Sequence, residues 1–155
     1  MKTVNSFPPP EECNCFAVRA AARHVSQSYD RFLAPTGLRT TQYSILTRLK
    51  RKGPLSINAL AEDMVMDRTT LGRNIRPLQR DGLITITSAA SDRRAKELRL
   101  TKAGENRMQE AFEGWSQAQA RFEAAFGERR AAGLRKLLRS AAASEFIRIS
   151  ATSTR

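Results

Sequence analysis

Apolar residues recur at intervals of three and four along most of the chain, which is the period of an amphipathic helix. The first of these stripes runs from Cys15 to Phe32, and the last runs from Leu134 to Ala141. The same spacing, bounded by polar capping residues and by glycine or proline stops, predicts four more helices, over 40–52, 56–64, 68–80 and 101–126.

Two short segments alternate between apolar and polar residues instead, at Ile84–Thr87 and at Leu98–Leu100. Such alternation is typical of half-buried β-strands, and the polar, basic stretch 88–95 between them predicts a hairpin with a long tip. Two short helices joined by a tight turn and followed by a hairpin form a winged helix-turn-helix. We therefore predict a mainly α fold with six helices and a small β-hairpin wing.

The two ends of the chain lack this periodicity. Pro8, Pro9 and Pro10 cannot enter a helix interior, so residues 1–12 are expected to form a flexible tail. Residues 150–155 should fray in the same way. Between these tails we expect a single domain over 13–150.

The helix-turn-helix and the hairpin occupy residues 40–100, and long helices flank this lobe on both sides. The apolar stripes of the flanking helices are wider than one small domain can cover. An α-rich chain with such stripes usually pairs with a copy of itself. We therefore predict a homodimer held together by the helices over 13–36 and 101–149.

The composition adds a strong positive charge to this picture. The 155 residues include 27 Lys and Arg against 15 Asp and Glu, which gives a formal net charge of +12. Such an excess indicates a polyanionic partner, either nucleic acid or an anionic membrane. No apolar run approaches the roughly 20 residues of a membrane span, and the first residues lack the apolar stretch of a signal peptide. We expect a cytoplasmic protein whose partner is nucleic acid and not a membrane.

One histidine and two cysteines leave little room for catalysis or metal binding. Neither a histidine-rich zinc site nor paired CxxC clusters can be built. A Ser-His-Asp triad would depend on His24 alone, and no glycine-rich phosphate loop is present. We therefore expect no enzyme, no cofactor and no metal site.

The positive charge is concentrated in the predicted helix over 68–80 and in the hairpin. Arg68, Thr69, Gly72, Arg73 and Arg76 fall away from the apolar stripe of that helix. Arginines can fork onto guanine edges or phosphates, threonine offers a hydroxyl and a methyl group, and glycine permits close approach. A merely solvated basic face is the weaker interpretation, because a capped helix and a hairpin lie where the DNA-binding motif requires them.

The chain resembles the MarR regulators of multiple-antibiotic resistance over about 13–146. The resemblance rests on four strings: GLRTTQYSIL, SINALAEDM, DRTTLGRNIRPLQRDGLI and SDRRAKELRLTKAG. It implies a winged-helix dimer that binds operator DNA, with Arg73 as a DNA contact. It also implies a wing in which Asp92 braces Arg94, which reaches toward the minor groove. Altogether the predicted DNA contacts are Ser56, Arg68, Thr69, Thr70, Arg73, Asn74, Arg76, Arg93 and Arg94.

Cys13 and Cys15 open the first predicted helix, and this feature is similar to the organic-hydroperoxide repressors, a redox-sensing branch of the same family. In that branch a cysteine near this point is oxidised while tyrosines hold its thiolate, and Tyr29 and Tyr43 lie at similar spacings here. A helix N-terminus and a nearby cation such as Arg19 also favour a reactive thiol. Two alternatives stay open: Cys15 as a small buried hydrophobe, and metal binding by the cysteine pair, which is the weakest.

The same family often releases DNA when a small aromatic acid binds between the dimer helices and the DNA-binding lobe. The candidates to line such a crevice are Arg19, Arg23, His24, Tyr29 and Tyr43. Aromatic residues at helical spacing are more often part of a core. We therefore keep both roles for the tyrosines.

These arguments predict a transcriptional regulator, which we expect to be a repressor. It should bind palindromic duplex DNA as a homodimer and be released by a small aromatic ligand or an oxidant. The alternative is a basic RNA-binding or protein-adaptor module. Sheet surfaces that read RNA usually display stacking aromatics. The predicted hairpin strands carry none, which favours DNA.

Overall fold

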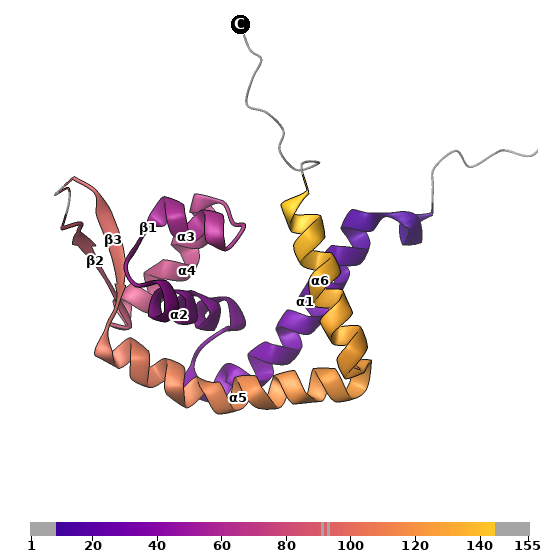
Figure 1. Ribbon diagram of the computed structural model, residues 1–155. Coiled ribbons are helices and arrows are strands. Elements are labelled where there is room, and N and C mark those ends of the chain that lie inside the picture. Colours follow the sequence, from indigo (N-terminus) through magenta and orange to yellow (C-terminus); the bar gives the residue numbers. More distant parts are fainter. Residues whose placement is uncertain (1–8, 91, 93, 145–155) are drawn as a thin grey trace, which may run out of the picture.

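The computed structural model describes residues 9–144 except 91 and 93, and within them it contains six α-helices and a small sheet. The predicted fold class is therefore confirmed (Figure 1). Most of the two predicted tails lies outside the described residues, although Pro10–Glu12 form an exposed 3-10 turn, η1. The helices are α1 (Asn14–Leu33), α2 (Thr40–Lys52), α3 (Ile57–Asp63), α4 (Arg68–Arg80), α5 (Lys102–Phe126) and α6 (Glu128–Ala143).

The helices α2, α3 and α4 and the sheet enclose one apolar core, which forms a lobe on one side of the molecule (Figure 1). Each of these helices turns its apolar stripe inward, so that Leu46, Leu60 and Leu71 are completely buried. Leu33, at the end of α1, and Ala111, from the middle of α5, complete the same cluster. The lobe is thus closed by residues from its own chain.

The sheet contains one strand more than the predicted hairpin. β2 (Ile84–Ser88) pairs antiparallel with β3 (Lys96–Leu100), and β1 (Leu55–Ser56) pairs with the other edge of β3. Leu98 is therefore opposite both Leu55 and Ile86, and it is completely buried. A strand of two residues shows no periodicity, which is why β1 could not be predicted from the pattern.

α5 connects the lobe to α1 and α6 and approaches its neighbours closely at two glycines. A Cβ atom at Gly104 would collide with the carbonyl oxygen of Leu83, and one at Gly114 would collide with that of Phe32. These contacts place the helix directly against the start of the hairpin and the end of α1. Thr101 caps α5 as predicted, because its hydroxyl accepts a hydrogen bond from the Gly104 amide at 3.0 Å.

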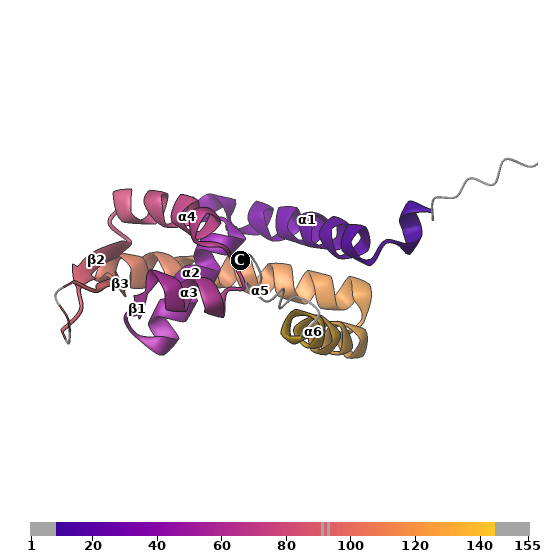
Figure 2. The same ribbon diagram turned by 90° about the horizontal axis from the view of Figure 1, so that it is seen from above.

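The first half of α1 and all of α6 form two arms that project from the same side of α5 (Figure 1). Seen from above, the arms lie on opposite sides of α5 (Figure 2). Their large apolar side chains are exposed in the single chain, including Phe16, Val18, Leu137 and Leu138. Cys13 and Cys15 are exposed as well, so within one chain Cys15 is not the buried hydrophobe that its stripe allowed.

Candidate nucleic-acid interface

The two faces of α4 differ sharply in chemistry. Leu71, Ile75 and Leu78 are buried in the lobe, whereas Arg68, Thr69, Arg73 and Arg76 are exposed. The helix begins at Asp67, whose carboxylate accepts hydrogen bonds from the amide and the hydroxyl of Thr70 at 2.8 and 2.6 Å. Both bonds lower the pKa of Asp67 below its usual value, and the bond from the Thr70 hydroxyl has the larger effect. The capping carboxylate is therefore ionised at neutral pH. The basic face thus belongs to a helix whose N-terminus is capped and whose other side is packed in the core.

Three of the predicted DNA-contacting residues use a side-chain polar group in a hydrogen bond within the chain. Ser56 caps α3, since its Oγ accepts from the Ala59 amide at 3.1 Å. The hydroxyl of Thr70 donates to Asp67, and Nδ2 of Asn74 donates to the Thr70 carbonyl at 3.0 Å. These side chains therefore hold α3 and α4 in place, and their roles toward DNA stay predictions.

The turn between α3 and α4 contains a strained residue that sequence reasoning missed. Val65 has a φ of 51°, in the left-handed region, and 71% of its surface is exposed. A β-branched side chain is unfavourable in that region. Nothing in the apolar pattern indicates this strain, because the backbone conformation follows from how α3 and α4 pack.

The tip of the wing is held through its main chain. Oδ1 of Asp92 accepts a hydrogen bond from the amide of Arg94 at 2.9 Å, and its carbonyl accepts from the amide of Ala95 at 3.0 Å. The predicted brace therefore acts on the backbone of Arg94, whose side chain is exposed. The predicted contact Arg93 lies outside the described residues.

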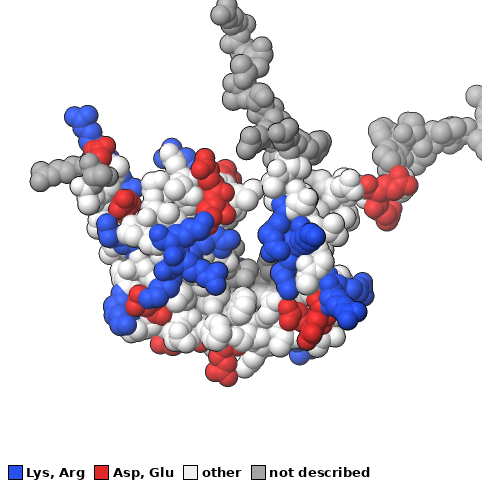
Figure 3. All heavy atoms as spheres, in the orientation of Figure 1, with Lys and Arg blue, Asp and Glu red and all other residues white. Residues whose placement is uncertain are grey.

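Basic residues also gather at the end of α2, over the lobe, and along α6 (Figure 3). Part of the charge on α2 is engaged within the chain. Asp63 pairs with Arg48 at 2.8 Å and with Lys52, and Glu105 pairs with Lys50 at 2.6 Å. The hydrogen bond from Lys52 is the main cause that lowers the pKa of Asp63. These pairs tie α2 to α3 and α5, which the sequence did not indicate.

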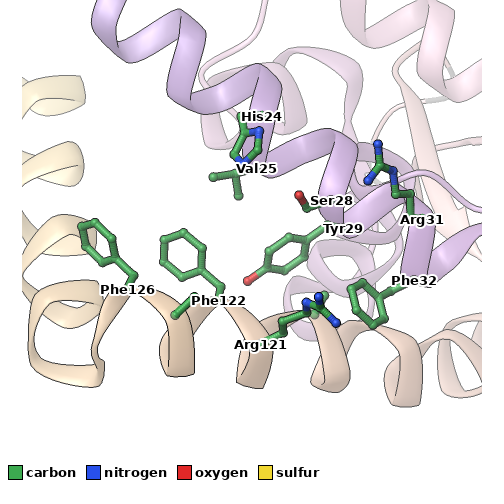
Figure 4. A pocket seen from close by; sticks show the side chains of 11 residues that line it. His24, Val25, Ser28, Tyr29, Arg31, Phe32, Arg121, Phe122 and Phe126 are labelled. Carbon is green, nitrogen blue, oxygen red and sulfur yellow. The ribbon is translucent and has the colours of Figure 1, made fainter.

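Tyr29 lies in a pocket of about 660 Å³ between α1 and α5 (Figure 4). Its hydroxyl donates to Oε1 of Gln119 at 2.7 Å. Burial, together with the negative charge of Glu123, raises the pKa of Tyr29, so the phenol stays protonated at neutral pH. The other lining residues are aromatic or cationic for the most part, and they include His24, Arg31, Phe32, Arg121, Phe122 and Phe126.

Tyr43 belongs to a different cleft, of about 680 Å³, between α2 and α5. Its ring stacks on Trp115 at 6.2 Å between centroids, and Trp115 stacks on Phe112 at 6.0 Å. Within one chain the two tyrosines therefore line different pockets, and the expected crevice with both tyrosines stays a prediction. Arg19 and Arg23 line neither pocket.

Cys15 and Tyr29 are also far apart within one chain. Cys15 and Tyr29 are 14 residues apart on α1, which corresponds to about 21 Å along a helix. In a single chain, Tyr29 therefore cannot hold the thiolate of Cys15. Cys13 caps α1 instead, since its Sγ accepts from the Phe16 amide at 3.4 Å.

A helix-turn-helix with a basic outer helix, followed by a wing, defines a winged-helix DNA-binding protein. Residues 38–96 match the family model of the MarR family. The chain is similar to the M. tuberculosis transcriptional regulator MosR, solved in complex with DNA, with 36% identity, a TM-score of 0.75, and coverage of 89% of this chain and 100% of that chain. The protein belongs to the MarR family of transcriptional regulators, and the predicted membership is confirmed.

Other comparisons agree with this assignment. A second structure of MosR from M. tuberculosis has 34% identity and a TM-score of 0.74, and the match covers 88% of this chain and all of that one. The organic hydroperoxide resistance transcriptional regulator of Bacillus subtilis (strain 168) is 27% identical over 90 residues, which are 58% of this chain and 61% of that protein. Members of this family are transcriptional regulators rather than enzymes. Among the described helices, none is both long and apolar enough to cross a membrane.

Proposed function

We propose that this protein represses transcription by binding a palindromic duplex operator as a homodimer. The observation that carries the proposal is the division of α4 into a buried apolar face and an exposed face with Arg68, Thr69, Arg73 and Arg76. A helix of this kind fits the major groove, where arginine can read guanine edges and contact phosphates. Two copies of α4, related by the dimer axis, then meet two half-sites about 34 Å apart.

The wing supplies the second contact of each half-site. The side chain of Arg94 is exposed, and Asp92 holds the backbone that carries it. An arginine at this position can enter the narrow, negatively charged minor groove beside the site of α4. Arg93 is proposed to add a phosphate contact.

The test begins with selection of duplexes from a randomised pool, followed by fluorescence anisotropy with the enriched duplex and with a hairpin RNA. We expect a palindrome to be enriched and the RNA to bind weakly. Arg73→Ala should weaken operator binding about 5- to 150-fold if Arg73 reads a base edge. Arg129→Ala, which removes an exposed arginine on α6, is the matched control. Equal binding of hairpin RNA, or no enriched palindrome, would reject the proposal in favour of an RNA-binding or adaptor module.

The pocket around Tyr29 is proposed as the site of a small aromatic acid that releases the operator. Phe32, Phe122 and Phe126 offer aromatic walls, and Arg121 offers a cation for a carboxylate, whereas Arg31, which also lines the pocket, points away from these rings (Figure 4). Benzoate and 4-hydroxybenzoate are suitable probes. Either should weaken operator binding by the wild type but not by Arg121→Gln, with Arg129→Gln as the control. Equal sensitivity of both variants would exclude this pocket.

An oxidant is the alternative signal, favoured by the exposure of Cys13 and Cys15. A hydroperoxide would oxidise the Cys15 thiolate to a sulfenate and would itself be reduced to the alcohol. Because Tyr29 of the same chain is too distant, Tyr29 could approach the thiolate only from the second subunit. Cumene hydroperoxide should then release the operator from the wild type and not from Cys15→Ser. Retention of DNA by the oxidised wild type would reject this signal.

A further inference from the structure

The exposed face of α4 lacks a side chain at Gly72, a half-exposed position between the buried stripe and the arginines. Gly72 lies one helical turn after Arg68 and one turn before Arg76, and Thr69 and Arg73 lie beside it. Residues three and four positions apart are neighbours on a helix surface. Arg68, Thr69 and Arg76 therefore border a notch that Gly72 leaves open, and Arg73 follows it in the chain.

Two other helical glycines of this chain, Gly104 and Gly114, have a reason within the fold, whereas Gly72 and Gly133 have none among the described residues. Gly104 and Gly114 allow α5 to touch the backbone at Leu83 and Phe32. At Gly72, by contrast, apart from its chain neighbours and the nearby backbone of α4 itself, no heavy atom of the described residues lies within 4 Å of the place that a Cβ would occupy. Glycine is less favourable in a helix interior than any residue except proline. Nothing in the described part of the chain compensates for this loss.

We propose that Gly72 is the point where the backbone of α4 comes closest to duplex DNA. The missing side chain allows the helix to settle deeper into the major groove, while the neighbouring side chains reach base edges and phosphates. A Cβ at this position would stand between the helix and the base pairs. This inference rests on the proposed function, since it requires α4 to enter the groove.

The test uses Gly72→Ala and Gly72→Leu, because both residues are better helix formers than glycine. Either variant should raise the Tm of the free protein by about 2–4 °C. The affinity for the selected operator duplex should fall about 5- to 150-fold, as for a lost base contact, and Leu should have the larger effect. A rise in stability together with a loss of affinity is a signature that a purely structural role for Gly72 cannot produce.

Gly133→Ala is the matched control, because Gly133 is also helical with no atom within 4 Å of its Cβ position, but it lies on α6. It should raise the Tm without changing operator affinity, at a concentration where sedimentation finds the dimer intact. If both Gly72 variants bind like the wild type while Arg73→Ala weakens binding, the inference is overturned and the proposed function stands. A lower Tm for Gly72→Ala would also overturn it. If the wild type binds no duplex, the proposed function fails, and this inference fails with it.

Discussion

The helices of the lobe and of the arms have the same amphipathic pattern, but their apolar side chains are buried in the lobe and exposed in the arms. In the lobe, Leu46, Leu60 and Leu71 are completely buried by other residues of the chain. In the arms, Leu137 is 71% exposed and Leu138 43% exposed, and Ala131 is the one buried residue of α6. An apolar stripe thus indicates that a helix has a face to bury, but it does not indicate which molecule buries it.

This difference predicts that the two regions depend on a second subunit to different degrees. The core of the lobe is closed within one chain, so α4 and the wing are already held in place before a second subunit binds. The arms leave apolar area in water, which is unfavourable by about 25 cal/mol for each Å² that a partner would cover. We therefore expect the arms to determine dimerisation and the lobe to determine DNA contact.

The largest effect should follow from breaking the arms. Leu137→Glu combined with Leu138→Glu places charges on the apolar face of α6, and it should convert the dimer to monomers in sedimentation. Operator binding should then fall about 10²- to 10⁴-fold, because two linked half-site contacts become one. Lys136→Glu is the control. It places a glutamate at a neighbouring exposed position and should leave the dimer intact. An unchanged dimer in the double variant would show that α6 is not part of the interface.

Within the lobe, Leu71→Ala should reduce the free energy of unfolding by about 2–5 kcal/mol, because it leaves a cavity beneath α4. The urea midpoint, measured with the m-value, gives this loss. Gln79→Ala, at an exposed position of the same helix, should change stability by less than about 0.5 kcal/mol. Equal effects of the two substitutions would contradict a closed core at Leu71.

A substitution at Val65 should have a smaller effect, and it should increase the free energy of unfolding rather than decrease it. Val65→Gly removes the strain of a β-branched residue at a φ of 51° and an exposed apolar side chain. It should raise the free energy of unfolding by about 1 kcal/mol. Thermal unfolding measures this gain, and Val18→Gly, within α1, should instead destabilise its helix. A loss of stability in Val65→Gly would show that the valine packs against something in the assembled protein.

The smallest expected effect concerns pH and the cap of α4. Hydrogen bonds from Thr70 lower the folded-state pKa of Asp67. The resulting stability is present above the unfolded pKa and is lost as the pH falls through the lower folded pKa. Asp67→Asn keeps a good cap without this titration, so it should lose less stability between pH 7 and pH 3 in urea unfolding. An identical loss in both proteins would contradict the role of the carboxylate.

Much of the lobe could be predicted because local signals agree there. The caps at Ser56, Asp67 and Thr101 are formed as the sequence indicated. The basic face of α4 followed from a period of 3.6 residues, which separates Arg73 from Leu71 and Ile75. Periodicity predicts such features because a helix or strand determines the relative directions of its own side chains.

The tertiary structure decided how these faces meet. It separated Tyr29 from Tyr43, added β1 to the hairpin, strained Val65 and left Gly72 without a neighbour. It also turned the brace at Asp92 toward the backbone of the wing. The sequence by itself determined the elements, their apolar and basic faces and the family, because these depend on residues close together in the chain. Which face covers which, and at what distance, depends on packing between segments far apart in sequence, and only the folded chain decides that.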